Sequence, residues 1–107
     1  MKEYFPDRWV ILKINTATEI FYKVFASWHG GFTQGESWKF SSKIEEVEDR
    51  GTHFYVKMNS GSAYSLFAGE AAYSTSGFTE GVLQHTLEKY PQASVLSFEQ
   101  ALEVLRS

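Results

Sequence analysis

The side chains that could do chemistry in this sequence are three histidines, many serines and a short run of carboxylates, while cysteine is absent. Without cysteine the chain has no disulfide, thiolate metal ligand or thiol nucleophile. His29 ends one predicted strand and His53 begins another, which separates them by roughly 20 Å at about 3.3 Å per residue. His85 lies just off the apolar side of a predicted helix. We therefore expect no metal site.

Neither the serines nor the carboxylates form a catalytic pattern. No serine stands in a Gly-x-Ser-x-Gly elbow between a strand and a helix. Glu45, Glu46, Glu48 and Asp49 lie close together, but in an extended segment neighbouring side chains point to opposite faces. Charges that protect a strand edge from pairing explain them adequately. We expect no covalent nucleophile and no cofactor, and an acid/base enzyme using these carboxylates is kept as an alternative.

The glycine-rich segment 30–35 is the most permissive stretch of backbone, with three glycines in six positions. No predicted helix follows it, so no helix N-terminus would face a phosphate. The segment is predicted to be a hairpin loop flanked by Trp28, His29 and Phe32. Aromatic side chains on loops often contact partners, which makes these three residues binding candidates.

These side chains must be positioned by a sheet, because the first two-thirds of the chain alternates at the strand period of two. Short turns separate the alternating segments, which predicts an antiparallel five-stranded meander. Ser41 and Ser42 interrupt the third segment and suggest a bend or bulge. The predicted strands are 9–14, 20–29, 37–48, 52–58 and 62–67.

From residue 78 the apolar period becomes helical. The first helix ends at Tyr90, because Pro91 forces the preceding residue out of helical geometry. Residues 94–96 form a short extended piece, and Ser97 with Gln100 matches a capping box that opens a second helix. We expect both helices to cover one face of the sheet. The predicted fold is a single α+β domain spanning residues 1–107.

Alternation along the strands divides the predicted sheet into two faces. The core face carries Tyr22, Val24, Trp28, Phe40, Phe54 and Val56. The exposed face carries Trp9, Lys13, Lys23, Phe25, His29, Lys39, Lys43, His53, Tyr55 and Lys57. This concentration of lysines and rings is the most distinctive predicted surface. With the glycine-rich loop, it provides the candidate binding residues Phe25, Trp28, His29, Phe32, Lys23, Lys39, Tyr55 and Lys57.

Such a face permits three interpretations. The lysines can simply keep a sheet soluble while their stems cover the rings, the rings can bind another protein, or the face can stack bases and contact phosphates. The net charge of −3 disfavours a dedicated nucleic-acid binder. We predict a small non-catalytic module that contacts another protein, with single-stranded nucleic acid as the alternative ligand. A homodimer through an edge strand is left open.

The first residues mix both charge signs and include Pro6, so they lack the apolar stretch of a secretory signal. The longest early apolar run, 9–12, is too short to span a bilayer. We expect a cytoplasmic protein that does not enter a membrane.

Overall fold

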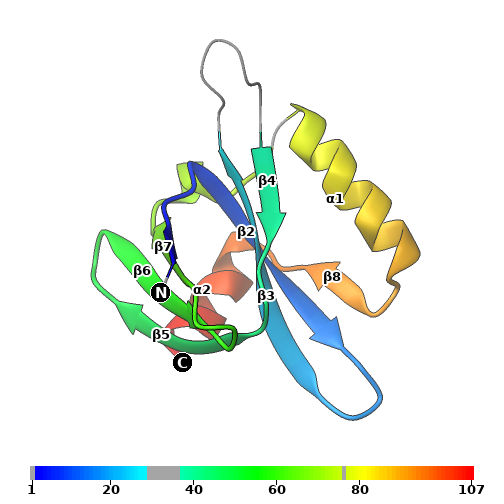
Figure 1. Ribbon diagram of the computed structural model, residues 1–107, viewed down its shortest axis with the longest axis horizontal. Helices are drawn as coiled ribbons and strands as arrows, with labels where there is room; N and C mark the ends of the chain where they lie inside the picture. The colour runs from blue at the N-terminus through cyan, green and yellow to red at the C-terminus, as the bar shows by residue number, and fades with distance from the viewer. Residues whose placement is uncertain (1, 29–36, 76) are drawn as a thin grey trace.

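The structure is a computed structural model that describes residues 2–28, 37–75 and 77–107. These residues form a mixed α+β fold with eight strands in two four-stranded sheets, two α-helices and one short 3₁₀ turn (Figure 1). We call the sheet with strand order β4-β3-β2-β8 sheet 1 and the sheet with order β1-β7-β6-β5 sheet 2. The strands are β1 Glu3–Tyr4, β2 Arg8–Asn15, β3 Ile20–Trp28, β4 Ser37–Phe40, β5 Ile44–Asp49, β6 His53–Met58, β7 Ala63–Phe67 and β8 Ala93–Val95. The helical segments are η1 Glu70–Ala72, α1 Gly77–Lys89 and α2 Phe98–Arg106.

The prediction of one five-stranded meander is wrong, because the third predicted strand divides between the two sheets. Its first part, β4, pairs antiparallel with β3, and its second part, β5, pairs antiparallel with β6. The division falls at the buried Ser41, whose N–H donates to the Val24 carbonyl at 2.8 Å. The Ser41 hydroxyl accepts from the Val24 N–H at 2.8 Å and donates to the Ser42 carbonyl at 2.7 Å. Because this side chain takes over a ladder bond, the backbone is free to turn toward the other sheet.

The two sheets pack face to face over a shared apolar core. Sheet 1 contributes Trp9 and Ile11 from β2 and Val24 from β3, and the facing strands of sheet 2 contribute residues such as Phe54 and Leu66. Trp9 was predicted on the exposed face, and that placement is wrong, since its side chain is fully buried. Its indole N–H donates to the Phe67 carbonyl at 2.9 Å, which provides the partner that a buried indole needs.

The helices cover different regions, so the prediction that both lie on one sheet face is also wrong. Helix α2 packs into the core between the sheets through Ala101 and Leu105. Helix α1 lies against the opposite face of sheet 1, where Leu83 joins a second cluster that includes Phe25. Sheet 1 is therefore covered on both faces, whereas the outer face of sheet 2 has no helix on it among the described residues (Figure 1).

The predicted helix signals are confirmed. The Ser97 hydroxyl accepts from the Gln100 N–H at 3.1 Å, and the Gln100 side chain accepts from the Ser97 N–H at 2.9 Å. Helix α1 ends at Lys89, two residues before Pro91. Within the described part of the chain, no helix combines the length and the apolar character needed to cross a membrane.

Candidate functional site

The predicted lysine and aromatic face is not one surface in the structure. Phe25 and Lys23 lie on the side of sheet 1 that α1 covers, and Tyr55 and Lys57 lie on the outer face of sheet 2. Lys39 and Trp28 lie on the inner side of sheet 1 near its β4 edge. The two remaining candidates, His29 and Phe32, and the glycine-rich segment 30–35 lie outside the described residues.

Phe25 cannot be the exposed anchor that the alternation predicted. Its side chain has 0% exposure and packs with Leu83 of α1. Its ring centroid lies 4.6 Å from that of Phe40 and 6.2 Å from that of Trp38. Lys23, two residues earlier, borders a groove of about 420 Å³ on the same side of sheet 1, next to the end of α1.

On the outer face of sheet 2, the candidates Tyr55 and Lys57 already interact with neighbouring charges. The Arg50 guanidinium lies 4.2 Å from the Tyr55 ring centroid, and the Tyr55 hydroxyl donates to Glu3 at 3.2 Å. The Lys57 ammonium lies 3.6 Å from a Glu46 carboxylate oxygen. This face thus compensates its own charges.

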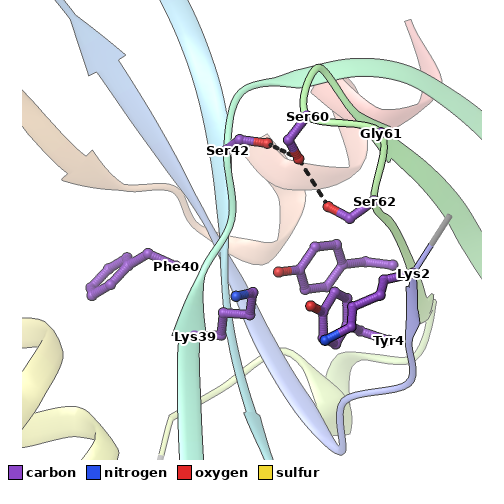
Figure 2. A pocket seen from close by; sticks show the side chains of 9 residues that line it. Lys2, Tyr4, Lys39, Phe40, Ser42, Ser60, Gly61 and Ser62 are labelled. Atoms are coloured by element: carbon purple, nitrogen blue, oxygen red, sulfur yellow. Dashed lines mark hydrogen bonds between the residues drawn. The ribbon is translucent and has the colours of Figure 1, made fainter.

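A cleft of about 710 Å³ opens between β4 of sheet 1 and the end of sheet 2 where β1 and β7 begin (Figure 2). We call it the Lys2–Lys39 cleft. Its lining residues are Lys2, Tyr4, Lys39, Phe40, Ser42, Ser60, Gly61, Ser62 and Tyr64. Of the candidates named from the sequence, Lys39 lines this cleft, and the half-buried Trp28 lies beside it with its ring centroid 6.1 Å from that of Tyr4.

The strand pleat directs two side chains into the cleft from the N-terminal segment. Ala63 of β7 donates its N–H to the Lys2 carbonyl at 2.8 Å, and Glu3 and Tyr4 continue the parallel pairing with β7. Successive side chains of a strand point to opposite faces. Lys2 and Tyr4 therefore share the cleft side, while Glu3 points to the outer face, where it accepts the hydrogen bond from Tyr55.

Lys39 reaches the cleft from the other side. It pairs with the buried Ala26 of β3, so its side chain lies on the inner face of sheet 1. Its ammonium lies 5.4 Å from the Tyr4 ring centroid, within the range of a cation–π interaction. Phe40 follows in the strand and turns its ring to the opposite side of β4 (Figure 2). Lys2 and Lys39 thus approach Tyr4 from opposite walls (Figure 2).

One end of the cleft is closed by a row of hydroxyls. Ser42, just after β4, donates to Ser60 at 2.8 Å, and Ser60 and Ser62 share a hydrogen bond at 3.1 Å (Figure 2). Ser60 and Ser62 flank Gly61 in the turn between β6 and β7. Gly61 has φ +96°, a left-handed conformation that glycine adopts readily. This conformation lets the turn present the two serines toward the β4 corner.

Tyr64 of β7 supplies the most informative side chain of the cleft. Its ring stacks on Tyr4 with centroids 4.9 Å apart and an interplanar angle of 25°. Its side chain has 0% exposure, yet its hydroxyl has no hydrogen-bond partner among the described residues. Burial, with a smaller contribution from the nearby Tyr4, raises the pKa of Tyr64 to about 12. The hydroxyl is therefore protonated at neutral pH and able to donate.

The side chains of the cleft supply cations and hydroxyls. Two ammonium groups and the hydroxyls of two tyrosines and three serines line it, and no described lining residue is a carboxylate or an imidazole. A hydrogen bond to a charged group contributes about 1.5–3 kcal/mol. This donor set suits an anionic group. Comparisons of the chain with protein-family models, curated proteins and solved structures find no match.

Most of this cleft was missed in the sequence. Lys2 and Tyr4 precede the first predicted strand, and β1 is only two residues long, which is too short to show alternation. The predicted strands 52–58 and 62–67 left Ser60 in a connecting turn and put Ser62 at the start of a strand, without a reason to expect a cleft there, whereas both serines lie between β6 and β7. A usable signal was Tyr64, a tyrosine in alternating register with the apolar Leu66 and therefore a polar tip directed into a core.

Proposed function

We propose that this chain is a non-catalytic binding module that contacts another protein, and that the Lys2–Lys39 cleft binds an anionic group of that partner. The buried hydroxyl of Tyr64 carries the proposal. Leaving a buried donor without a partner costs about 1–3 kcal/mol, and a ligand oxygen that accepts from this hydroxyl would remove that cost. The two lysines beside it have no carboxylate within ion-pair distance among the described residues.

The chemistry of the lining favours binding over catalysis. A general base at neutral pH needs a pKa near the operating pH. Burial moves the pKa of Tyr64 further from that range, to about 12. Among the described lining residues there is also no carboxylate or imidazole that could act as a general base or activate a lysine or serine nucleophile. An acid/base enzyme would have to use residues outside the cleft.

The distribution of lysines favours a protein partner over single-stranded nucleic acid. A strand of nucleic acid is held by a continuous cationic groove with stacking aromatics. Here Lys23, Lys39 and Lys57 lie on three different surfaces, and Lys57 pairs with Glu46. The cleft itself offers two lysines, which suits one or two acidic groups better than a chain of phosphates.

A quantitative pull-down tests this proposal. The wild-type chain and the variants Lys39→Ala and Tyr64→Phe are used as baits, with and without nuclease and over a salt series. We expect one defined protein to be retained by the wild type after nuclease treatment and to be depleted on both variants. Lys57→Ala is the matched control, because it removes a lysine whose charge is already compensated on the other surface.

Two results would contradict the proposal. If nuclease abolishes capture and the salt dependence is steep, the ligand is nucleic acid. If Lys39→Ala and Tyr64→Phe retain the same protein as the wild type, the partner does not use the cleft.

A further inference from the structure

The wall of the cleft formed by β4 is also a free sheet edge. Strand β4, Ser37–Phe40, is the terminal strand of sheet 1, and among the described residues its neighbour in the sheet is β3 alone. An edge strand presents unpaired N–H and C=O groups and can accept an extended segment of another chain.

The pairing with β3 determines which backbone groups are free. In an antiparallel pair, residues that exchange hydrogen bonds alternate with residues that do not. The N–H of Ser41 donates to Val24, so the residue two positions earlier, Lys39, also directs its backbone groups toward β3. The backbone N–H and C=O groups of Trp38 and Phe40 consequently face the open edge.

The side chains of β4 divide between the two faces of sheet 1. Lys39 lies on the inner face and lines the cleft, whereas Trp38 and Phe40 lie on the outer face with Phe25. Trp38 is 41% exposed, and its ring centroid lies 5.6 Å from that of Phe40. The edge therefore offers a cation on one side of the sheet and an aromatic row on the other.

We propose that the partner binds as an extended segment that pairs with the free edge of β4, places an acidic side chain opposite Lys39, and places apolar side chains opposite Trp38 and Phe40. This inference rests on the proposed function, because the acidic side chain is the anionic group of the cleft. It specifies the partner's chemistry as an alternation of apolar, acidic and apolar residues.

The pleat makes this alternation a geometric requirement. Residues directly opposite each other on two strands share a face of the sheet. When the segment adds antiparallel to β4, the residue opposite Lys39 belongs to a pair without mutual hydrogen bonds, in which the Cα atoms are closest, about 4.5 Å apart. A carboxylate there meets the Lys39 ammonium on the cleft side. Backbone hydrogen bonds form at Trp38 and Phe40, and β4 is long enough for about four residues, roughly 13 Å at 3.3 Å per residue.

The charge of Lys39 also makes pairing at this edge depend on the sequence of the added strand. A lysine on an edge strand opposes pairing with arbitrary apolar strands, because the added strand would have to bury or displace the charge. A segment with an acidic residue at that position removes this penalty. The same side chain thus excludes nonspecific pairing and favours one pattern.

Selection from a random peptide library tests the inference. A library of random linear peptides, long enough to pair along β4, is selected for binding to the wild-type chain. Peptides that also bind the Lys39→Glu variant are discarded. We expect the enriched sequences to share an apolar–acidic–apolar pattern. Exchanging the acidic residue of an enriched peptide for lysine should abolish binding to the wild type and restore binding to Lys39→Glu.

Two further measurements separate strand pairing from anion recognition. N-methylation of the peptide at the two apolar positions blocks the backbone hydrogen bonds and should weaken affinity about tenfold, which corresponds to about 1.4 kcal/mol. Binding of the unmodified peptide should slow amide hydrogen exchange at Trp38 and Phe40, while the Lys57→Ala control binds as the wild type does.

The outcomes are distinguishable. Unchanged affinity of the N-methylated peptide, together with a loss of affinity for Tyr64→Phe, overturns strand pairing but leaves the proposed function intact. Enriched peptides that ignore both Lys39 and Tyr64 overturn both. Failure to enrich any alternating sequence overturns the inference, as does concentration-dependent dimerisation abolished by Lys39→Glu, which would make a second copy of the chain the occupant.

Discussion

The outer face of sheet 2 and the Lys2–Lys39 cleft are built from similar side chains but differ in how their polar groups are satisfied. On the outer face, Tyr55 donates to Glu3 and stacks with Arg50. In the cleft, Tyr64 is buried with an unpartnered hydroxyl and Lys39 has a ring rather than a carboxylate beside it, as far as the described residues extend. Residue composition alone would rank the two regions equally.

The difference shows why charge compensation identifies a site better than residue type does. A surface whose cations and anions already pair gains little from a ligand, since the ligand must displace those contacts. Among the described residues, the cleft holds two lysines without a carboxylate partner and one unpartnered hydroxyl, so an anionic ligand there displaces fewer existing contacts. We therefore expect equivalent substitutions in the two regions to differ in their effects on stability and on peptide affinity.

The largest effect is expected on the side of sheet 1 that α1 covers, where Phe25 is buried. Phe25→Ala should lower the free energy of unfolding by about 3–5 kcal/mol, because it removes a buried ring under α1. Tyr55→Ala, on the exposed face of sheet 2, should cost less, about 1–2 kcal/mol, the scale of a surface cation–π contact together with the hydrogen bond to Glu3. Urea denaturation measures both. Equal costs would mean that α1 does not cover Phe25.

Substitutions of Lys39 and Lys57 should differ in their effect on peptide affinity. Lys39→Ala should weaken the affinity for an alternating acidic peptide by about tenfold or more, because a charge-assisted contact is lost. Lys57→Ala should leave that affinity within about twofold, since an exposed ion pair contributes only about 0–1 kcal/mol and lies elsewhere. Calorimetric titration of both variants measures the ratio. Equal affinities of the two variants would contradict the assignment of peptide binding to the cleft.

The stability of the fold at alkaline pH should depend on the ionisation of Tyr64. Its pKa is raised from 10.0 in an unfolded chain to about 12, so the folded state holds its proton more tightly. The associated stability is fully present below pH 10 and is lost as the pH rises toward 12. Tyr64→Phe should therefore show a shallower loss of stability across this window. Parallel curves for wild type and variant would show that Tyr64 ionises normally.

The smallest effect is expected on the outer face of sheet 2. A hydrogen bond from Arg50, and then its charge, lowers the pKa of Glu48 below its usual range. Arg50→Ala should return that pKa toward its usual value, with little change in peptide affinity. Carboxyl carbon shifts in an NMR titration report the change. Reduced peptide affinity in this variant would indicate that the outer face takes part in binding.

The elements of this fold were largely predictable, because they depend on local patterns. Alternation indicated β2, β3, β6 and β7, and Pro91 and the Ser97 capping box fixed the ends of the helices. The assembly of these elements was not predictable from alternation. The serine interruption at Ser41 was recognised as a bend, but its consequence is a change of sheet that depends on the distant Val24.

The faces were misassigned for a related reason. The run from Trp9 to Leu12 is apolar at four successive positions, a pattern typical of a strand buried on both faces. The prediction instead gave the whole sheet one core face and one exposed face, and the alternation of segment 20–29 then put Phe25 on the exposed one. The cleft required non-local pairing as well, because Lys2 and Tyr4 reach it only when β1 pairs with β7.

The most direct test of the unpartnered donor compares two single-atom deletions, Tyr64→Phe and Tyr55→Phe, by urea denaturation of the full chain. Removing the Tyr55 hydroxyl deletes a hydrogen bond to Glu3, and the free energy of unfolding should fall by up to about 1 kcal/mol. Removing the Tyr64 hydroxyl deletes a buried group without a partner, and the free energy of unfolding should stay constant or rise by about 1–3 kcal/mol. A loss of about 1 kcal/mol or more in Tyr64→Phe would contradict this, because it would show that the fold itself uses the hydroxyl.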